Sequence, residues 1–291
     1  MLNHIDAIAS RYRETLLQTK KSLMEIIQND IKMKDGNTEV FMSIVEQSME
    51  GIINNWVSGK KYTRTLFMGQ VMGDMYPQEA VELSLSVDSI INILDDILDE
   101  NLDKNTNAAY IVEIIRILAV FTSKLSDETQ RKSVENYFNK IISIAIGEQV
   151  YKNMIKNENN PEKIIDLITE VYACRSLDMD IFVELPLLEI SLSPSDVSRM
   201  LVLGRHFRTL NLIKKDIDDI ERDRIAETET GVTLSIEKGN PIEILRTITE
   251  RVVADSKQIN LDEQTHLADN FKKMIENEKQ EINKRLERIK Y

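Results

Sequence analysis

Residues 77–101, PQEAVELSLSVDSIINILDDILDEN, are the stretch around which the rest of the chain is organised. Pro77 suits the first turn of a helix, where its missing N–H would have no partner to lose. Apolar residues then recur at helical spacing, at Val81, Leu85, Ile90, Ile91, Leu94 and Leu98. The stretch therefore predicts one long helix that ends in a cluster of acidic residues.

Four aspartates lie on this largely apolar helix: Asp88, Asp95, Asp96 and Asp99. A helix directs Asp88, Asp95 and Asp99 roughly the same way, because they fall at i, i+7 and i+11. Carboxylates beside apolar surface repel one another and lose water, and a cation offsets that cost. Hard oxygen ligands of this kind suit Mg²⁺ that bridges to a substrate phosphate. The alternative is a solvated acidic helix end in a chain that is acidic throughout.

The composition favours an all-α fold. Of 291 residues, 42% are hydrophobic, whereas glycine and proline are scarce, at 9 and 5. Such a chain suits helices with short connections. We find no repeat, low-complexity tract or linker, so we expect residues 1–291 to form a single domain, an orthogonal or antiparallel bundle of ten or more helices.

The charge and the remaining composition narrow the class of function. The formal net charge of −12 argues against general nucleic-acid binding, which needs a basic face. The single cysteine, Cys174, excludes an internal disulfide framework. No apolar run reaches membrane-spanning length, and the N-terminus reads as an amphipathic helix rather than a leader peptide. We therefore expect a soluble cytoplasmic protein.

Helical periodicity and capping residues predict the other elements. Pro186 is expected to kink or end the helix that Asn160-Pro161 opens, and residues 224–239 are expected to form a loop. The predicted helices cover about 3–33, 38–57, 60–75, 108–125, 126–157, 161–191, 196–223, 241 onward and 261–289, and residues 193–196 are expected to cap the helix over 196–223.

A second acidic cluster lies near the end of the helix predicted over 196–223. Its members are Asp216, Asp218, Asp219, Glu221 and Asp223. If this second cluster faced the first across a bundle, the two clusters would line an opening that holds metal ions and binds phosphate. A di-iron bundle would need Glu-x-x-His pairs, and the three histidines, His4, His206 and His266, have no such partner.

Cationic residues near these clusters are candidates for anion binding. Lys60, Lys61 and Arg64 lie at a predicted helix N-terminus, where cations oppose the helix dipole; they indicate either an anion site or a solvated charge cluster. Arg175 lies among apolar neighbours. It is either a surface residue that snorkels or an inward phosphate ligand.

Several segments in this order resemble the trans-isoprenyl diphosphate synthase (polyprenyl synthetase) superfamily, whose members share the class I isoprenoid (terpenoid) synthase fold. Asp95-Asp96-Ile97-Leu98-Asp99 matches the first Asp-rich motif, D-D-x-x-D. The weaker matches are SGKKYTR at 58–64, GEQVYK at 147–152, LGRHF at 203–207, the acidic run at 216–223 and GVTLSIEKG at 231–239. The resemblance extends over residues 55–240.

The resemblance implies roles for individual residues. Asp95 and Asp99, supported by Asp96, would bind an allylic diphosphate through Mg²⁺, with three Mg²⁺ per active site. A further Mg²⁺ would be held by the second motif, for which Asp219 with Asp223 is the best match and Asp216 or Asp218 the alternative. The diphosphate would be bound by Arg175, Lys60, Lys61, Arg64 and Lys215. The family is commonly homodimeric.

Departures from the family pattern bear on the reaction. Arg175-Ser176 stands where the family has Lys-Thr, and arginine still binds diphosphate in a bidentate fashion. The Arg pair after the first motif is absent, and Asp88 replaces a histidine two turns before Asp95. In elongating enzymes those groups hold isopentenyl diphosphate, and an aspartate there would repel it.

These departures favour a terpene synthase-like enzyme that ionises an allylic prenyl diphosphate, releases diphosphate, and cyclises or transfers the prenyl group. The alternative is a trans-prenyl diphosphate synthase that condenses an allylic diphosphate with isopentenyl diphosphate. A quorum-peptide prenyltransferase and a non-catalytic subunit of a heteromeric synthase are further options; such subunits tend to lose the Asp motifs, which are present here.

The resemblance also places the floor of the chain pocket on the helix before Asp95, at Ser84, Val87, Ile90 and Ile91. None of these residues is aromatic, which indicates room for a chain of C15 or longer. Ordinary core packing is the alternative explanation for the same residues.

Overall fold

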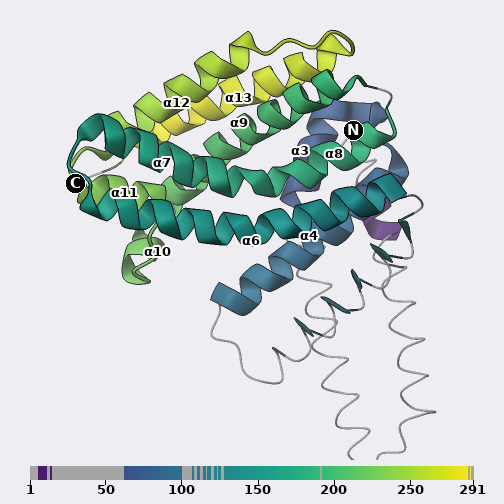
Figure 1. The fold of residues 1–291 in the computed structure, drawn as a ribbon, viewed down its shortest axis with the longest axis horizontal. Coiled ribbons are helices and arrows are strands. Elements are labelled where there is room, and N and C mark those ends of the chain that lie inside the picture. Colours follow the sequence, from purple (N-terminus) through teal and green to yellow (C-terminus); the bar gives the residue numbers. More distant parts are fainter. Residues whose placement is uncertain are drawn as a thin grey trace, which may run out of the picture. The chain divides into compact units, whose positions relative to one another are not determined.

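The computed structural model describes residues 6–11, 14, 62–99, 128–190, 192–287 and 289, with scattered positions between 107 and 125. Over this part of the chain it forms ten α-helices, two 3-10 turns and no strand, which confirms the all-α prediction (Figure 1). The chain divides into two compact units, Met1–Gln130 and Arg131–Tyr291. The expected single domain stays a prediction.

The described part of the first unit is built on α3 (Thr63–Met72), the 3-10 turn η1 (Gly73–Met75) and α4 (Gln78–Asp99). Helix α4 begins directly after Pro77, whose carbonyl accepts a hydrogen bond from the Val81 N–H at 3.0 Å. This confirms the start predicted for the acidic helix. Helix α3 packs against α4, and Met68 and Val71 on α3 are fully buried.

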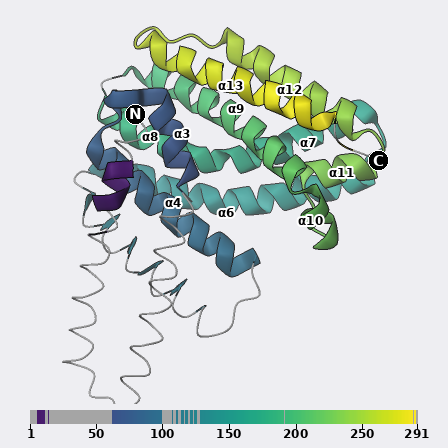
Figure 2. The ribbon, with the colours of Figure 1, turned by 180° about the vertical axis from the view of Figure 1, so that it is seen from behind.

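The second unit contains the remaining described helices. They are α6 (Glu128–Asn157), α7 (Pro161–Ser176), α8 (Asp180–Leu188), α9 (Pro194–Asp218), α10 (Ile220–Ile225), α11 (Gly231–Glu237), α12 (Pro241–Gln258) and α13 (Thr265–Leu286). Helix α9 lies between α13 on one side and α7 on the other, and both views agree on this order (Figures 1 and 2). Its apolar side chains, among them Phe207 and Leu210, are therefore buried on both sides.

Polar caps fix where two of these helices begin. The Asn160 side chain accepts hydrogen bonds from the N–H groups of Glu162 and Lys163, and Pro161 follows it at the first helical position. Ser193 accepts from the Asp196 N–H at 3.1 Å and caps α9 in the same way. The start at Asn160-Pro161 was predicted from the sequence, and the cap of α9 was predicted to lie within residues 193–196.

The break predicted at Pro186 is in the wrong place. The chain leaves α-helical geometry earlier, at the 3-10 turn η2 (Leu177–Met179), and Pro186 lies inside α8. Tertiary contacts stabilise the turn: the Tyr137 hydroxyl donates to the Asp178 carbonyl at 3.0 Å, and Arg208 binds the Asp178 carboxylate. These partners come from α6 and α9, so local sequence pattern did not reveal them.

Three further boundaries differ from the prediction. The helix expected over 196–223 is interrupted at Asp219, which separates α9 from α10. The loop expected over 224–239 contains α11, which begins with a capping box between Thr230 and Thr233. The last helix begins at Thr265 rather than near 261.

The helices expected over 3–33 and 38–57 lie largely outside the described residues, and the helix expected over 108–125 is described only at scattered positions. Over the part of the chain that the structure does describe, no helix has the length and apolar character needed to cross a membrane.

Candidate active site

The centre of the candidate site is an ion pair between Arg175 on α7 and Asp216 on α9. The Arg175 guanidinium donates from Nη1 to Oδ2 of Asp216 at 2.7 Å and from Nη2 to Oδ1 at 3.3 Å. The Arg175 side chain keeps 20% of its surface exposed, whereas that of Asp216 keeps only 4%. Two-point pairing of this kind fixes both the position and the plane of the guanidinium.

Tyr172 on α7 also forms a hydrogen bond with Asp216. Its hydroxyl donates to Oδ2 of Asp216 at 3.1 Å, and Arg175 lies 5.9 Å from the centre of its ring. Burial, followed by the charge of Asp216, raises the pKa of Tyr172 well above its ordinary value, so the hydroxyl remains a donor. Tyr172 was not identified from the sequence, although it lies one helical turn before Arg175.

Gly231 at the start of α11 leaves room for the Tyr172 ring. A Cβ at this position would lie 2.4 Å from Cε2 and 2.7 Å from Oη of Tyr172, closer than side chains tolerate. The segment 231–239, noted in the sequence for its resemblance to the family, therefore contacts the residue that holds Asp216.

Glu148 on α6 adds a second carboxylate beside Arg175. Its Oε1 lies 4.0 Å from Nε of Arg175 and 2.7 Å from Nζ of Lys152. The sequence singled out GEQVYK as a segment but did not identify Glu148 within it. The signal available was the single acid in that segment.

Asp223 lies close enough to Asp216, Asp219 and Arg175 for their charges to act on its carboxyl. Asp219 accepts a hydrogen bond from Arg222 at 2.8 Å, whereas Asp223 is 6% exposed and has Arg222 at 3.8 Å. Burial, followed by the charges of Asp216 and Asp219, raises the pKa of the Asp223 carboxyl, while Arg222 and Arg175 lower it. The structure thus groups Asp216, Asp219, Asp223 and Arg175.

Asp218, the other alternative for the second motif, has a different environment. Its side chain is half exposed and binds Nε of Arg285 on α13 at 2.7 Å. Lys215, predicted to bind diphosphate, is exposed on α9. A cavity of about 470 Å³ lies beside Asp223, and its lining residues are Asp223, Arg224, Glu227, Thr228, Glu229, Thr233, Ile236 and Glu237.

In the first unit, Arg64 and Asp88 form a buried ion pair. The Arg64 guanidinium donates from Nη1 to Oδ1 of Asp88 at 3.1 Å. The N–H and hydroxyl of Thr65 donate to Oδ2 at 2.9 Å and 2.8 Å. Burial raises the pKa of Asp88, although Arg64 and Thr65 lower it. The sequence raised both residues as candidates but did not predict that they pair.

The predicted chain-pocket residues are all buried on α4. Ser84 and Val87 are 0% exposed, Ile90 is 2% and Ile91 is 8%. The Tyr76 hydroxyl also donates to Oγ of Ser84 at 2.9 Å. Burial suits both a pocket floor and ordinary packing, so the chain-pocket role stays a prediction.

Five of the predicted site residues have no described side chain. The backbone of Asp95, Asp96 and Asp99 lies in the last turns of α4, but their side chains are outside the described residues. Lys60 and Lys61 lie outside them entirely.

The donor set around Asp223 suits Mg²⁺ chemically. Among the described residues no group of three or more His, Cys, Asp or Glu side chains is arranged to hold a metal ion. Mg²⁺ ordinarily takes one or two protein carboxylates and completes its shell with water and substrate phosphate. The carboxyl of Asp223, whose pKa is raised by burial and then by the charges of Asp216 and Asp219, fits such a site.

Comparison with solved structures identifies a protein of similar fold. The chain is similar to a crystal structure of a putative geranylgeranyl pyrophosphate synthase from Corynebacterium glutamicum, with a TM-score of 0.53 and 14% identity. The match covers 98% of this chain and 88% of that one. No protein-family model and no curated protein sequence matches the chain. The likeness shows that the two chains share an all-α fold, which is the fold class predicted from the sequence.

Proposed function

We propose that the protein is a Mg²⁺-dependent enzyme that ionises an allylic prenyl diphosphate of C15 or longer. The observation that carries the proposal is the grouping of Arg175 with Asp216 on α9, Asp219 between the two helices and Asp223 on α10. It combines a two-point anion ligand with carboxylates suited to divalent cations. The fold and the D-D-x-x-D sequence at Asp95–Asp99 on α4 add independent support.

In the proposed reaction Arg175 binds the diphosphate oxygens, assisted by Lys60, Lys61 and Lys215. Asp95, Asp96 and Asp99, together with Asp216, Asp219 and Asp223, would hold three Mg²⁺. The bound ions would stabilise the charge that develops on the leaving diphosphate. The C–O bond then breaks heterolytically, the electron pair leaves with the diphosphate, and an allylic cation remains. Loss of a proton after cyclisation, or capture by an acceptor, completes the reaction.

The pairing of Arg64 with Asp88 favours ionisation without isopentenyl diphosphate. The sequence resemblance made Arg64 a candidate diphosphate ligand, but its guanidinium is buried and donates to Asp88. The carboxylate at position 88 is in turn satisfied by Arg64 and Thr65. Recruiting Arg64 to a second diphosphate would leave a buried carboxylate short of its cationic partner, which is costly.

A second candidate is a trans-prenyl diphosphate synthase that elongates the chain with isopentenyl diphosphate. It is favoured by the similarity to the Corynebacterium glutamicum protein, whose name is that of such an enzyme. The two candidates share the diphosphate and metal ligands and differ in the need for an acceptor.

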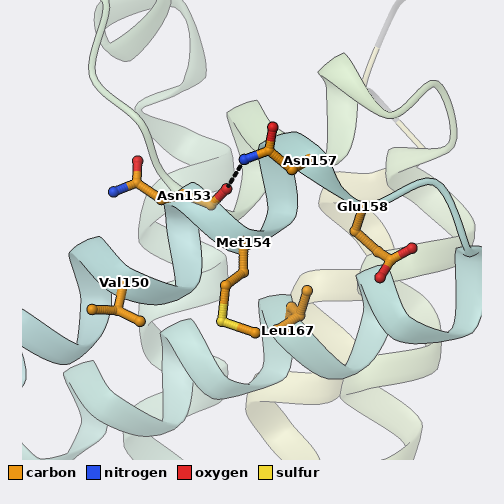
Figure 3. Close-up of a pocket in the computed structure, with 6 residues that line it drawn as sticks. All are labelled: Val150, Asn153, Met154, Asn157, Glu158 and Leu167. Atoms are coloured by element: carbon orange, nitrogen blue, oxygen red, sulfur yellow. Dashed lines mark hydrogen bonds between the residues drawn. The ribbon is translucent and has the colours of Figure 1, made fainter.

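We also propose that the protein acts as a homodimer. Helix α6 carries Ile146, Val150 and Met154 at i, i+4 and i+8, and their exposed fractions are 62%, 51% and 49%. A cavity of about 510 Å³ lies along this face, and Figure 3 shows Met154 beside Leu167 of α7, with Val150 further along α6. Ile146→Lys is expected to lower the mass measured by light scattering. The control is Ile225→Lys at another exposed isoleucine, and an unchanged mass for Ile146→Lys would contradict the proposal for this face.

The experiment that separates the two enzymatic candidates is product analysis with Mg²⁺. Geranyl, farnesyl and geranylgeranyl diphosphate are each supplied with and without isopentenyl diphosphate. Hydrocarbons or alcohols formed without the acceptor support the first candidate. Longer diphosphates formed only with the acceptor support the second.

A further inference from the structure

Arg175 and Asp216 bind each other in an ion pair. In the proposed reaction, however, Arg175 binds diphosphate and Asp216 binds a metal ion, so the two side chains must separate. Arg175 uses Nη1 and Nη2 on Asp216, so two of its donors are occupied. Asp216 accepts from Arg175 on both oxygens and from Tyr172 on Oδ2. In this arrangement the guanidinium neutralises the carboxylate, and neither is fully available to an outside ligand.

The burial of the two side chains decides which of them an outside ligand reaches first. One fifth of the Arg175 surface is exposed, whereas Asp216 is almost completely covered. An anion can therefore approach Arg175 before any cation reaches Asp216. Oε1 of Glu148 lies 4.0 Å from Nε of Arg175, so a carboxylate remains near the guanidinium if it turns away from Asp216.

We propose that Arg175 exchanges Asp216 for the substrate diphosphate, so that anion binding to Arg175 and cation binding to Asp216 strengthen each other. This inference rests on the proposed function. Before substrate binds, Arg175 takes the place of a metal ion beside Asp216. When diphosphate binds Arg175, Asp216 becomes a buried carboxylate in need of a cation.

The coupling follows from the cost of each step taken alone. A buried carboxylate that loses its cationic partner is strongly destabilised, so diphosphate alone gains little by removing Arg175. A metal ion alone must displace a guanidinium held at two points. When both ligands bind, each offsets the cost of the other, and linkage requires the same factor in both directions. Tyr172 keeps its hydrogen bond to Asp216 throughout and holds the carboxylate in place.

The test measures binding rather than turnover, with the full chain, Mn²⁺ and inorganic pyrophosphate. Free Mn²⁺ is measured by electron paramagnetic resonance, and its complexes with pyrophosphate in solution are counted separately. In the wild-type protein, pyrophosphate is expected to tighten Mn²⁺ binding about tenfold or more, in the usual range of such couplings. In Arg175→Gln, Mn²⁺ alone is expected to bind about tenfold more tightly than in the wild type, with less than about twofold further effect of pyrophosphate.

A reciprocal variant and a matched control complete the design. Asp216→Asn releases Arg175 from its charged partner, so pyrophosphate without metal is expected to bind several-fold more tightly than in the wild type. It also keeps the test open if Arg175→Gln does not fold. Arg251→Gln removes an arginine of the same unit that pairs with the exposed Asp166 at 2.7 Å. It is expected to bind both ligands as the wild type does.

The outcomes separate the exchange from the proposed function. If Arg175→Gln binds Mn²⁺ alone no more tightly than the wild type, or if Asp216→Asn gains no affinity for pyrophosphate, the exchange is wrong. Wild-type binding of both ligands with independent affinities also overturns the exchange but leaves the proposed function standing. If the wild-type protein binds neither Mn²⁺ nor pyrophosphate when both are present, both the proposed function and the exchange are wrong.

Discussion

Arg64 on α3 and Asp88 on α4 form an ion pair that is closed off from solvent. Nη1 of Arg64 lies 3.1 Å from Oδ1 of Asp88, and their side chains are 7% and 0% exposed. Thr65 adds two hydrogen bonds to the other carboxylate oxygen. The pair links α3 to α4 and stabilises the packing of the two helices. Helix α4 is the helix that ends in the D-D-x-x-D motif.

Arg64→Gln is expected to lower the free energy of unfolding by about 3–5 kcal/mol, because it leaves the buried Asp88 carboxylate without a cation. Urea denaturation measures the change. Arg251→Gln serves as the control, since it removes an exposed ion pair that contributes no more than about 1 kcal/mol. Equal losses in the two variants would show that the Arg64–Asp88 pair has no special structural role.

Asp223→Asn is expected to stabilise the metal-free protein at neutral pH. The folded-state pKa of Asp223 is raised above its ordinary value of 3.8, so the native state binds more protons than the unfolded state between the two values. Wild-type stability is therefore lost as pH rises through that window, and an uncharged Asn escapes the loss.

Thermal unfolding with a chelator, followed from pH 3.5 to 8, measures this effect. The advantage of Asp223→Asn should vanish at the acidic end of the range and shrink at neutral pH when Mg²⁺ is added. Asp269→Asn on α13 controls for removing one charge from an acidic chain. An advantage that is the same at every pH would contradict the account.

Gly231→Ala is expected to destabilise the protein by about 1–3 kcal/mol, the usual range for an overpacked core. The new Cβ would meet the Tyr172 ring at 2.4 Å, and the ring can move only by disturbing its bond to Asp216. We therefore expect weaker pyrophosphate binding in the presence of Mg²⁺ as well. Gly239→Asn is the control, because a Cβ there has nothing within 4 Å and Asn tolerates its φ of 82°.

Sequence reasoning succeeded where the signal was local. Pro77, Asn160 and Ser193 marked helix starts because a cap or an N-terminal proline acts within one turn. It failed where contacts with residues far away in the sequence determine the local structure. The turn at Leu177–Met179 depends on Tyr137 and Arg208, and the role of Tyr172 depends on Asp216, 44 residues away. The aspartates of the site were predicted, but Glu148 was not, nor was the cation that each carboxylate binds.

Ile91→Phe is expected to shift substrate preference towards shorter prenyl diphosphates if Ile91 lines the chain pocket. At 8% exposed, Ile91 has more room for a ring than Val87, which is fully buried. Relative kcat/KM values for geranyl, farnesyl and geranylgeranyl diphosphate measure the shift. Ile93→Phe, at a position that is 4% exposed and was not predicted to line the pocket, is the control. If both variants keep the wild-type preference, Ile91 is a packing residue.

Release of diphosphate from farnesyl and geranylgeranyl diphosphate, measured without isopentenyl diphosphate, tests the central proposal most directly. We expect the wild-type protein to release diphosphate only when Mg²⁺ is present. Asp99→Asn should lower kcat about 10²–10³-fold, the usual cost of losing one group that stabilises transition-state charge. The exposed Asp74→Asn should retain wild-type activity. The proposal is contradicted if neither farnesyl nor geranylgeranyl diphosphate releases diphosphate in a Mg²⁺-dependent manner. Full activity in Asp99→Asn would also contradict it.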